Sequence, residues 1–372
     1  MIKLLIVDDS ALMRKLLEGI FQEQGDFEVR LARNGIEALE LVRSFDPKVV
    51  TLDIQMPGMD GLACLSRIMI ESPRPVVMIS SLTAEGAEAT LEAIELGAVD
   101  FVAKPSGAAS LEIDRLRPLL IEKVRAAAGA RIRRTLRLTE RVRHQIRGVG
   151  LPSGGRPALP PSPLAKAGPR AKSRSSAAPG LVLIGTSTGG PAALDVVLPQ
   201  LPADFPWPVL VAQHLPGSFT GPFARRLDRE CQLHVVEVDR PMPLKPGTIY
   251  VGKGDADLVV AKRAAGISAM PVPAHASYPW HPSVERLVSS ALVQFDANRL
   301  IGVLMTGMGN DGAEAMKRLR EGRGRTIAEA ESTAIVWGMP GELVKNGGAE
   351  MVKALDDIAA TIIDLVSADA PC

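Results

Sequence analysis

Apolar and polar positions follow a regular order along the first hundred residues. Five short apolar runs occur, "KLLIV", "EVRLA", "VVTLD", "PVVMIS" and "DFVAK", and between them apolar residues recur every three or four positions. The runs predict buried strands, and the intervening patterns predict amphipathic helices over 11–23, 35–44, 61–72, 87–96 and, after the last strand, 111–128. Strands that alternate with helices indicate an α/β fold, with a parallel sheet covered on both faces.

The same alternation of predicted strands and helices occurs in the second half of the chain. Strands are predicted at "LVLIG", "PVLVAQ", "LHVVEV", "TIYVG" and "LIGVLMTG". Helical patterns fit 191–198, 218–228, 282–294, 312–321 and 355–366. This half therefore predicts a second doubly wound α/β domain.

A different composition separates the two halves. Residues 131–147, "RIRRTLRLTERVRHQIR", hold seven arginines and one glutamate, and 148–179 are rich in Pro, Gly and Ser. The second stretch cannot bury a core and is typical of a linker. The arginines could bind an acidic partner or nucleic acid, but the lack of interleaved aromatic residues favours a solvated helical extension. We predict an N-terminal domain over 1–128, a linker over 129–179 and a second domain over 180–367.

Composition and charge narrow the class of protein. Lys and Arg total 43 and Asp and Glu total 42, so the net charge of +1 gives no general reason to expect nucleic acid as a partner. No apolar run approaches the roughly 18 residues of a membrane helix, and "MIKLLIVDDS" turns acidic too soon for a signal peptide. Three widely spaced cysteines indicate neither a disulfide framework nor a zinc site. We expect a cytoplasmic protein that is not inserted in a membrane.

Polar residues of the N-terminal half gather at the carboxyl ends of its predicted strands. Asp8 and Asp9 follow the first strand, Asp53 ends the third, Ser80 ends the fourth and Lys104 follows the fifth. With strand order 2-1-3-4-5, the three carboxylates converge in one crevice. Like charges there need a cation, for which Mg²⁺ is the natural candidate. The lysine and the hydroxyl suit a phosphoryl group.

These residues carry a first resemblance. "LIVDDSALMRKLL", "TLDIQMPGMDG", "MISSLT" and "DFVAKP" resemble a response-regulator receiver domain of flavodoxin-like fold over roughly residues 1–105. The resemblance implies that Asp53 accepts a phosphoryl group from a histidine kinase, and that Ser80 and Lys104 sense it and alter a distant face. It also implies the ligands of a Mg²⁺ ion, namely Asp8, Asp9, Asp53 and the backbone carbonyl of Gln55.

A serine-containing turn opens the second domain. In "LVLIGTSTGGP", an apolar run ends at Ser187, which is flanked by glycines. A phosphate-binding loop would need a lysine, and the spacing of a dinucleotide fingerprint is absent. A tight corner would explain the glycines but not the serine. A nucleophile would explain both, since a helix beginning at "GGP" offers free N–H groups to a developing oxyanion.

Two other residues have a comparable setting. His214 follows "PVLVAQ", and Asp311 lies in the turn "MGNDG" after a strand. Together with Ser187 they supply a nucleophile, a base and an orienting carboxylate at one sheet edge. A plain binding cleft would be equally consistent with the spacing alone. The other histidines lack such a setting, namely His144, His234, His275 and His281.

A second resemblance favours the nucleophile. "IGTSTGGPAAL", "VAQHLPGSFTGPFARRL", "VLMTGMGNDGAEAMKRL" and "MPGELV" resemble the catalytic domain of the chemotaxis protein-glutamate methylesterases. Receiver, linker and esterase occur in that family's order, so the resemblance covers nearly the whole chain. It implies Ser187 as nucleophile, His214 as general base and Asp311 as the carboxylate that orients His214. It further implies the Met308 N–H as an oxyanion donor, with Thr188 beside the nucleophile.

The resemblance also implies an activity and its control. The substrates would be glutamate methyl esters, and certain glutamines, on membrane chemoreceptors, and the reaction would serve chemotactic adaptation without a cofactor in the esterase domain. The unphosphorylated receiver would cover the cleft. Two segments depart from the family pattern, 252–257 in "YVGKGDADLVV" and 280–285, "WHPSVE". They lie at the expected substrate rim, so we expect them to affect receptor choice.

Two other hypotheses belong to different classes of protein. In the first, the C-terminal domain docks a receptor or scaffold under phosphorylation control and performs no chemistry. In the second, the receiver controls DNA binding through the arginine-rich segment. The large α/β domain lacks a helix-turn-helix pattern, which weighs against DNA binding.

Overall fold

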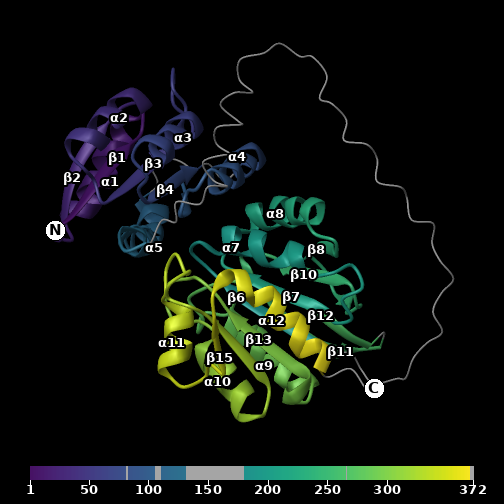
Figure 1. The fold of residues 1–372 in the computed structure, drawn as a ribbon. Coiled ribbons are helices and arrows are strands. Elements are labelled where there is room, and N and C mark those ends of the chain that lie inside the picture. Colours follow the sequence, from purple (N-terminus) through teal and green to yellow (C-terminus); the bar gives the residue numbers. More distant parts are fainter. Residues whose placement is uncertain (81–82, 105–109, 131–179, 265, 369–372) are drawn as a thin grey trace.

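A computed structural model of the chain describes residues 1–80, 83–104, 110–130, 180–264 and 266–368. Two α/β sheets occupy these ranges, and Figure 1 shows them as two bodies, one purple to blue and one teal to yellow. The predicted linker and its arginine-rich segment lie almost wholly outside the described residues.

The N-terminal sheet has five parallel strands in the predicted order β2-β1-β3-β4-β5. The strands are β1 (Ile2–Val7), β2 (Phe27–Ala32), β3 (Val49–Asp53), β4 (Val76–Ser80) and β5 (Asp100–Ala103). The helices are α1 (Ala11–Gln22), α2 (Gly35–Ser44), α3 (Gly61–Glu71), α4 (Ala84–Glu95) and α5 (Ser110–Ala128). Each helix begins and ends within three residues of its predicted bounds.

The alternating direction of side chains along β1 explains why helices cover both faces of this sheet. Leu4 and Ile6 pack with apolar residues of α1 and α5, whereas Leu5 and Val7 pack with those of α2, α3 and α4. Successive side chains of a strand point to opposite faces, so a strand that is apolar throughout needs cover on both sides.

The second sheet has seven parallel strands in the order β15-β14-β13-β6-β7-β10-β8. They are β6 (Leu181–Thr186), β7 (Val209–Gln213), β8 (His234–Val238), β10 (Thr248–Gly252), β13 (Leu300–Leu304), β14 (Arg325–Glu329) and β15 (Met351–Lys353). From β6 the chain first builds outward through β7, then returns to the other side of β6 with β13. The boundary between β6 and β13 is therefore a topological switch point, where α/β sheets bind ligands.

Helices cover both faces of this sheet as well. One face carries α7 (Gly190–Val197), α8 (Gly217–Glu230) and α12 (Leu355–Ala368), and the other carries α9 (Val284–Gln294), α10 (Ala313–Glu321) and α11 (Met339–Lys345). Two short 3₁₀ turns, η1 (Leu198–Gln200) and η2 (Ala297–Arg299), precede later strands.

Several elements of the second domain escaped the sequence analysis. These are β14, β15, α11 and a separate antiparallel sheet of β9 (Met242–Pro243), β11 (Ala256–Arg263) and β12 (Gly266–Pro273). The strand β15 and the helix α11 are only three and seven residues long, too short to show a period. The hairpin β11–β12 is stabilised by its position over α9, which local pattern does not reveal.

Candidate functional sites

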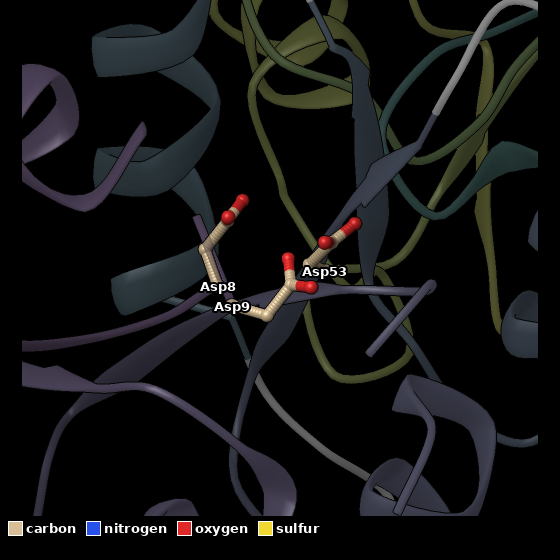
Figure 2. A group of neighbouring side chains, drawn as sticks. All are labelled: Asp8, Asp9 and Asp53. Atoms are coloured by element: carbon tan, nitrogen blue, oxygen red, sulfur yellow. The ribbon is translucent and has the colours of Figure 1, made fainter. Parts of the chain in front are cut away.

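Three carboxylates meet at the carboxyl edge of the first sheet. Asp8 and Asp9 follow β1, and Asp53 is the last residue of β3, the strand paired with β1. One oxygen of each lies within 4.8 Å of the others, and Figure 2 shows the three side chains as one group. Asp8 is fully buried and Asp53 is 3% exposed, whereas Asp9 reaches solvent.

Lys104 partly compensates this negative charge. Its Nζ lies 2.9 Å from Asp53 Oδ2 and 3.0 Å from Asp8 Oδ2. Burial raises the pKa of Asp53, although the hydrogen bond and charge of Lys104 act in the opposite direction. Burial would lower the pKa of Lys104, but its bonds and attractions to the two carboxylates together raise it. One lysine among three carboxylates leaves the pocket with surplus negative charge.

The donor set fits a hard divalent cation. Asp8 Oδ2 is buried and, among the described residues, has an ion pair with Lys104 Nζ at 3.0 Å but no other polar partner. A buried carboxylate oxygen that can accept a further partner, beside two other carboxylates, is a suitable ligand for Mg²⁺. Gln55 lines the same pocket, as does Ser80. The Ser80 hydroxyl donates to the Gly86 carbonyl of α4 at 3.1 Å.

The serine turn of the second domain lies between β6 and α7. Gly189 has a φ of 77° and caps the helix, and Pro191 falls in the first helical turn, as the sequence predicts. A Cβ on Gly190 would lie 1.9 Å from Gln213 Oε1. Glycine at 190 therefore allows this turn to approach β7 closely.

Gln213 joins the turn to the strand that precedes His214. Its Nε2 donates to the carbonyl of Ser187 at 3.0 Å and to that of His214 at 3.2 Å, and its Oε1 accepts from Thr186 Oγ1 at 2.5 Å. It is 1% exposed. This residue was not predicted from the sequence, although a glutamine that ends an otherwise apolar strand was an available signal.

His214 and Asp311 lie in direct contact. His214 Nε2 is 2.9 Å from Asp311 Oδ2, and both side chains are less than a tenth exposed. His214 Nδ1 is buried without a partner among the described residues. No hydrogen bond joins the Ser187 hydroxyl to His214 within the described part of the chain, and such bonds often tighten only with substrate present.

Asp311 also fixes the start of α9. Besides His214 it accepts from the Ser283 hydroxyl at 3.0 Å and from the N–H groups of Val284 at 2.6 Å and Glu285 at 3.1 Å. A carboxylate at a helix N-terminus satisfies otherwise orphaned N–H groups and interacts favourably with the helix dipole. These donors hold the carboxylate in place beside His214.

The turn after β13 packs against the serine. A Cβ on Gly307 would lie 2.8 Å from Ser187 Cβ and 2.4 Å from Met339 Sδ. The next residue, Met308, is 4% exposed. The structure therefore brings the turn that contains Met308 next to the serine, and the Thr188 carbonyl accepts from Thr306 Oγ1 at 2.9 Å.

The two segments expected at the substrate rim, 252–257 and 280–285, meet at one place. Asp257, from the first segment, accepts from His281 Nδ1 at 2.8 Å and from the Ser283 N–H at 2.7 Å, both in the second segment. It also accepts from Arg286 at 2.5 Å. Burial would raise the pKa of Asp257, but these hydrogen bonds together lower it.

His281 does not follow a strand, but the structure gives it a place near the proposed triad that the sequence did not predict. It has a carboxylate partner and lies close to the His214–Asp311 pair, because Ser283 touches both Asp257 and Asp311. Next to it in the chain, Trp280 has its ring within 5° of parallel to the His214 ring, with centroids 6.1 Å apart. Of the other histidines, His234 pairs with Asp228, His275 lies near Tyr278, and His144 is outside the described residues.

The first domain contacts the serine turn directly. The Thr188 hydroxyl donates to Asp100 of β5, and the Gly189 N–H donates to the Val99 carbonyl at 3.1 Å. The N-terminus of α7 is therefore not free, contrary to the expectation from the sequence. A receiver residue occupies one of its donors, which the sequence could not reveal.

Further contacts join the two domains beside the turn. The rings of Phe101 in β5 and Phe219 in α8 have centroids 4.3 Å apart. Arg226 of α8 bonds Glu95 of α4 at 2.7 Å, and Figure 1 shows these two helices side by side. The first domain thus lies against the α7–α8 side of the second, next to the proposed nucleophile.

Within its described residues, the chain has no helix that is both long enough and apolar enough to span a bilayer.

Both domains match known families. The family described as "Response regulator receiver domain" matches residues 4–114, and the one described as "CheB methylesterase" matches 182–362. The fold and these two matches thus define a class, a receiver domain joined to a methylesterase domain with a parallel α/β sheet.

Relatives of full length make the assignment more specific. The chain is 65% identical, over all of both sequences, to "Protein-glutamate methylesterase/protein-glutamine glutaminase 2" of Rhodopseudomonas palustris (strain BisB18). It is 56% identical to "Protein-glutamate methylesterase/protein-glutamine glutaminase 3" of Rhodospirillum rubrum, over 97% of this chain and 95% of that one. Among solved structures, the catalytic domain of the Thermotoga maritima CheB methylesterase covers 51% of this chain and 100% of its own, with a TM-score of 0.49 and 33% identity. The chain belongs to the chemotaxis family of protein-glutamate methylesterases/protein-glutamine glutaminases, and it is a hydrolase.

Proposed function

We propose that this chain hydrolyses glutamate methyl esters, and deamidates specific glutamines, on membrane chemoreceptors, through Ser187, His214 and Asp311. The observation that carries the proposal is the bonded His214–Asp311 pair beside the serine turn at the switch point of the sheet. The domain limits 1–128, 129–179 and 180–367, and a cytoplasmic location, are part of this proposal.

The proposed chemistry follows from the arrangement of the three side chains. His214 Nε2 is held by Asp311, so Nδ1 is the nitrogen that can accept the Ser187 proton. Ser187 Oγ attacks the ester carbonyl, and the bond to the methoxy group breaks as His214 gives the proton to the leaving oxygen, which departs as methanol. Water, deprotonated by His214, then hydrolyses the acyl-serine to glutamate. For glutamine, ammonia leaves in place of methanol.

The oxyanion requires backbone donors next to Ser187. The Met308 N–H is the first candidate, because the turn that contains it packs against Ser187. Thr188 lies on the other side of the nucleophile. Each such donor contributes on the order of 3 kcal/mol to transition-state stabilisation. The ionised Asp311 meanwhile stabilises the imidazolium that forms on His214.

In the receiver, we propose that Asp53 accepts a phosphoryl group from a histidine kinase. Asp8, Asp9, Asp53 and the Gln55 carbonyl would hold Mg²⁺, which supplies positive charge that offsets the charge of the phosphoryl oxygens. Lys104, already bonded to Asp53, would then pair with the phosphoryl group. The Ser80 hydroxyl, bonded to Gly86 in the present arrangement, would turn toward the same group.

We propose that the receiver inhibits the enzyme by occupying the serine turn. The Val99 carbonyl accepts the Gly189 N–H, and Asp100 accepts from Thr188, so substrate cannot use these donors. Phosphorylation would shift α4, which carries the Ser80 partner Gly86, and β5, which carries Asp100. An interface change of about 1.4 kcal/mol is enough for a tenfold change in activity.

The experiment measures methanol release from methyl-labelled receptor membranes. The wild type is compared with Ser187→Ala, each with and without a small phosphodonor and Mg²⁺. We expect release by the wild type, an increase with the phosphodonor, and no release by Ser187→Ala under either condition. An Asp53→Asn variant serves as the matched control and should keep basal release while losing the response to the phosphodonor.

Full release by Ser187→Ala would contradict the triad. Phosphorylation-dependent binding to receptors without release by the wild type would instead support the docking-module hypothesis.

A further inference from the structure

The start of α9 lies between two buried carboxylates. Asp311 accepts the N–H groups of Val284 and Glu285, and Asp257 accepts the N–H group of Ser283. Asp257 is 1% exposed and Asp311 is 6% exposed. Burying two carboxylates at one helix start costs free energy unless each is fully hydrogen-bonded. A simple helix cap does not account for both of them.

Ser283 is the residue that connects the two carboxylates. Its N–H donates to Asp257 at 2.7 Å, and its hydroxyl donates to Asp311 Oδ1 at 3.0 Å. The same hydroxyl oxygen accepts the N–H of Arg286 at 3.3 Å, as an N-cap. The residue is fully buried. An N-cap needs only the last of these contacts, so the bond to Asp311 is additional.

The four donors on Asp311 leave it little freedom to rotate. Oδ1 accepts from Ser283 and Glu285, and Oδ2 accepts from Val284 and His214. An ionised carboxylate has about four lone-pair sites, and all are used. Ser283 supplies the only side-chain hydroxyl among these donors, so it helps to fix the plane of the carboxylate and, through it, the imidazole ring.

Asp257 in turn holds Ser283 in place. It is ionised, with its pKa lowered by the bonds from His281, Ser283 and Arg286 against the effect of burial. These bonds tie the start of α9 to the beginning of the hairpin strand β11. The position of the Ser283 hydroxyl is therefore set from outside the proposed triad.

We propose that Ser283 is a positioning residue for the hydrolysis, whose hydroxyl holds Asp311 in the orientation that aligns His214 with Ser187. It acts through Asp311 and touches neither substrate nor nucleophile. The inference rests on the proposed function, because it assumes that the triad performs the reaction. Its contribution falls on the chemical step rather than on receptor binding.

The test uses the full-length chain, activated with a small phosphodonor and Mg²⁺, with methylated receptor membranes as substrate. We expect Ser283→Ala to lower kcat about tenfold with KM within twofold of the wild type. Ser283→Thr keeps a hydroxyl and should restore at least half of kcat. A residue that only stabilised the fold would not give this split between kcat and KM, nor this rescue.

Ser290→Ala is the matched control. Ser290 lies on the same helix and also bonds backbone groups, accepting from the Val260 N–H at 2.9 Å and donating to the Leu287 carbonyl at 2.8 Å. It makes no bond to Asp311, so kcat should be unchanged. If Ser283→Ala does not fold, Ser283→Cys replaces it, since the thiol has nearly the same shape and is a weak donor. A severalfold loss of kcat is then expected.

The outcomes separate this inference from the proposed function. If Ser187→Ala is inactive while the Ser283 variant keeps wild-type kcat, the positioning role is overturned and the triad stands. A Ser283 variant whose KM rises at constant kcat also overturns it, since the residue would then act on receptor binding. If Ser187→Ala is fully active, the triad falls and the inference falls with it.

Discussion

The close packing around Ser187 depends on two glycines, which have no side chain. Gly190 lies against Gln213, and Gly307 lies against Ser187 and Met339. At both positions a methyl group would meet an atom within 2.4 Å. Glycine is required there for proximity rather than for a left-handed backbone, because φ is not positive at either residue.

Gly307→Ala tests this at residue scale. The added Cβ would push the turn of Met308 away from Ser187, and small displacements of catalytic groups can lower rates by about a hundredfold. We expect methanol release to fall by this order, with a loss of about 1–3 kcal/mol in the free energy of unfolding from overpacking. Receptor-membrane assays and denaturant unfolding measure the two effects.

Gly19→Ala in α1 is the control for this substitution. No atom lies within 4 Å of its added Cβ, so activity should be unchanged and stability should rise by up to about 1 kcal/mol. Wild-type activity in Gly307→Ala would mean that the turn of Met308 does not contribute to the reaction.

Individual residues of the proposed active site could be predicted from the sequence where they follow a predicted strand. Ser187, His214 and Asp311 each follow an apolar strand, and the structure brings the last two into contact. Gln213 and Ser283 were not identified, because their roles depend on which backbone groups lie next to them. The same applies to Asp257, whose partners lie 24 to 29 residues away in the chain.

At the scale of elements, a buried arginine of α8 forms an ion pair with α4 of the first domain. Arg226 is buried between Asp195 of α7 and Glu95 of α4, with bonds of 2.6 to 2.8 Å. Burial raises the pKa of Asp195 to about 7, while the charge of Arg226 acts against this. Removing Arg226 would leave a buried carboxylate unpaired, at a cost of about 3–5 kcal/mol to the second domain.

Glu95→Gln therefore isolates the contact between α4 and α8. It weakens the bond to Arg226 and leaves the pair with Asp195 in place. Glu95 is 32% exposed in its side chain, and partly exposed ion pairs contribute at most about 1 kcal/mol. We expect basal methanol release to rise by up to about fivefold, with little change after phosphorylation.

The comparison between basal and phosphodonor-activated rates decides this prediction. An equal rise in both rates would place the effect in the second domain rather than at the interface. Arg226→Ala is a poor substitute, because a stability loss would obscure any gain in rate.

At the scale of the whole molecule, the receiver lies over the turn of the proposed nucleophile. Its β5 contributes Asp100 and Phe101, and α4 contributes Glu95, so the contact uses one continuous face. The acidic pocket is at the carboxyl edge of the same sheet, where α4 meets Ser80 through Gly86. Asp100 begins β5 and Glu95 ends α4, so a change at Asp53 would reach the interface along the length of these two elements.

Deleting residues 1–147 tests the inhibition. Without the receiver, the Gly189 N–H and the Thr188 hydroxyl lose their partners and become accessible to substrate. We expect basal methanol release at least about tenfold above that of the unphosphorylated full-length chain, which corresponds to about 1.4 kcal/mol of interface energy. The truncated protein should not respond to a phosphodonor. A truncated protein as slow as the intact one would contradict inhibition while leaving the triad intact.

The sequence by itself determined the two α/β halves and the residues at the strand ends, whereas the strand order of the receiver came from its resemblance to a known fold. Hydrophobic period and strand-end chemistry are local, so they can be read without knowing the fold. The tertiary structure alone decided which residues of the two domains meet, such as Val99 with Gly189. It also decided that Asp257, Ser283 and Asp311 lie around one helix start, because contacts between distant segments depend on packing rather than on local pattern.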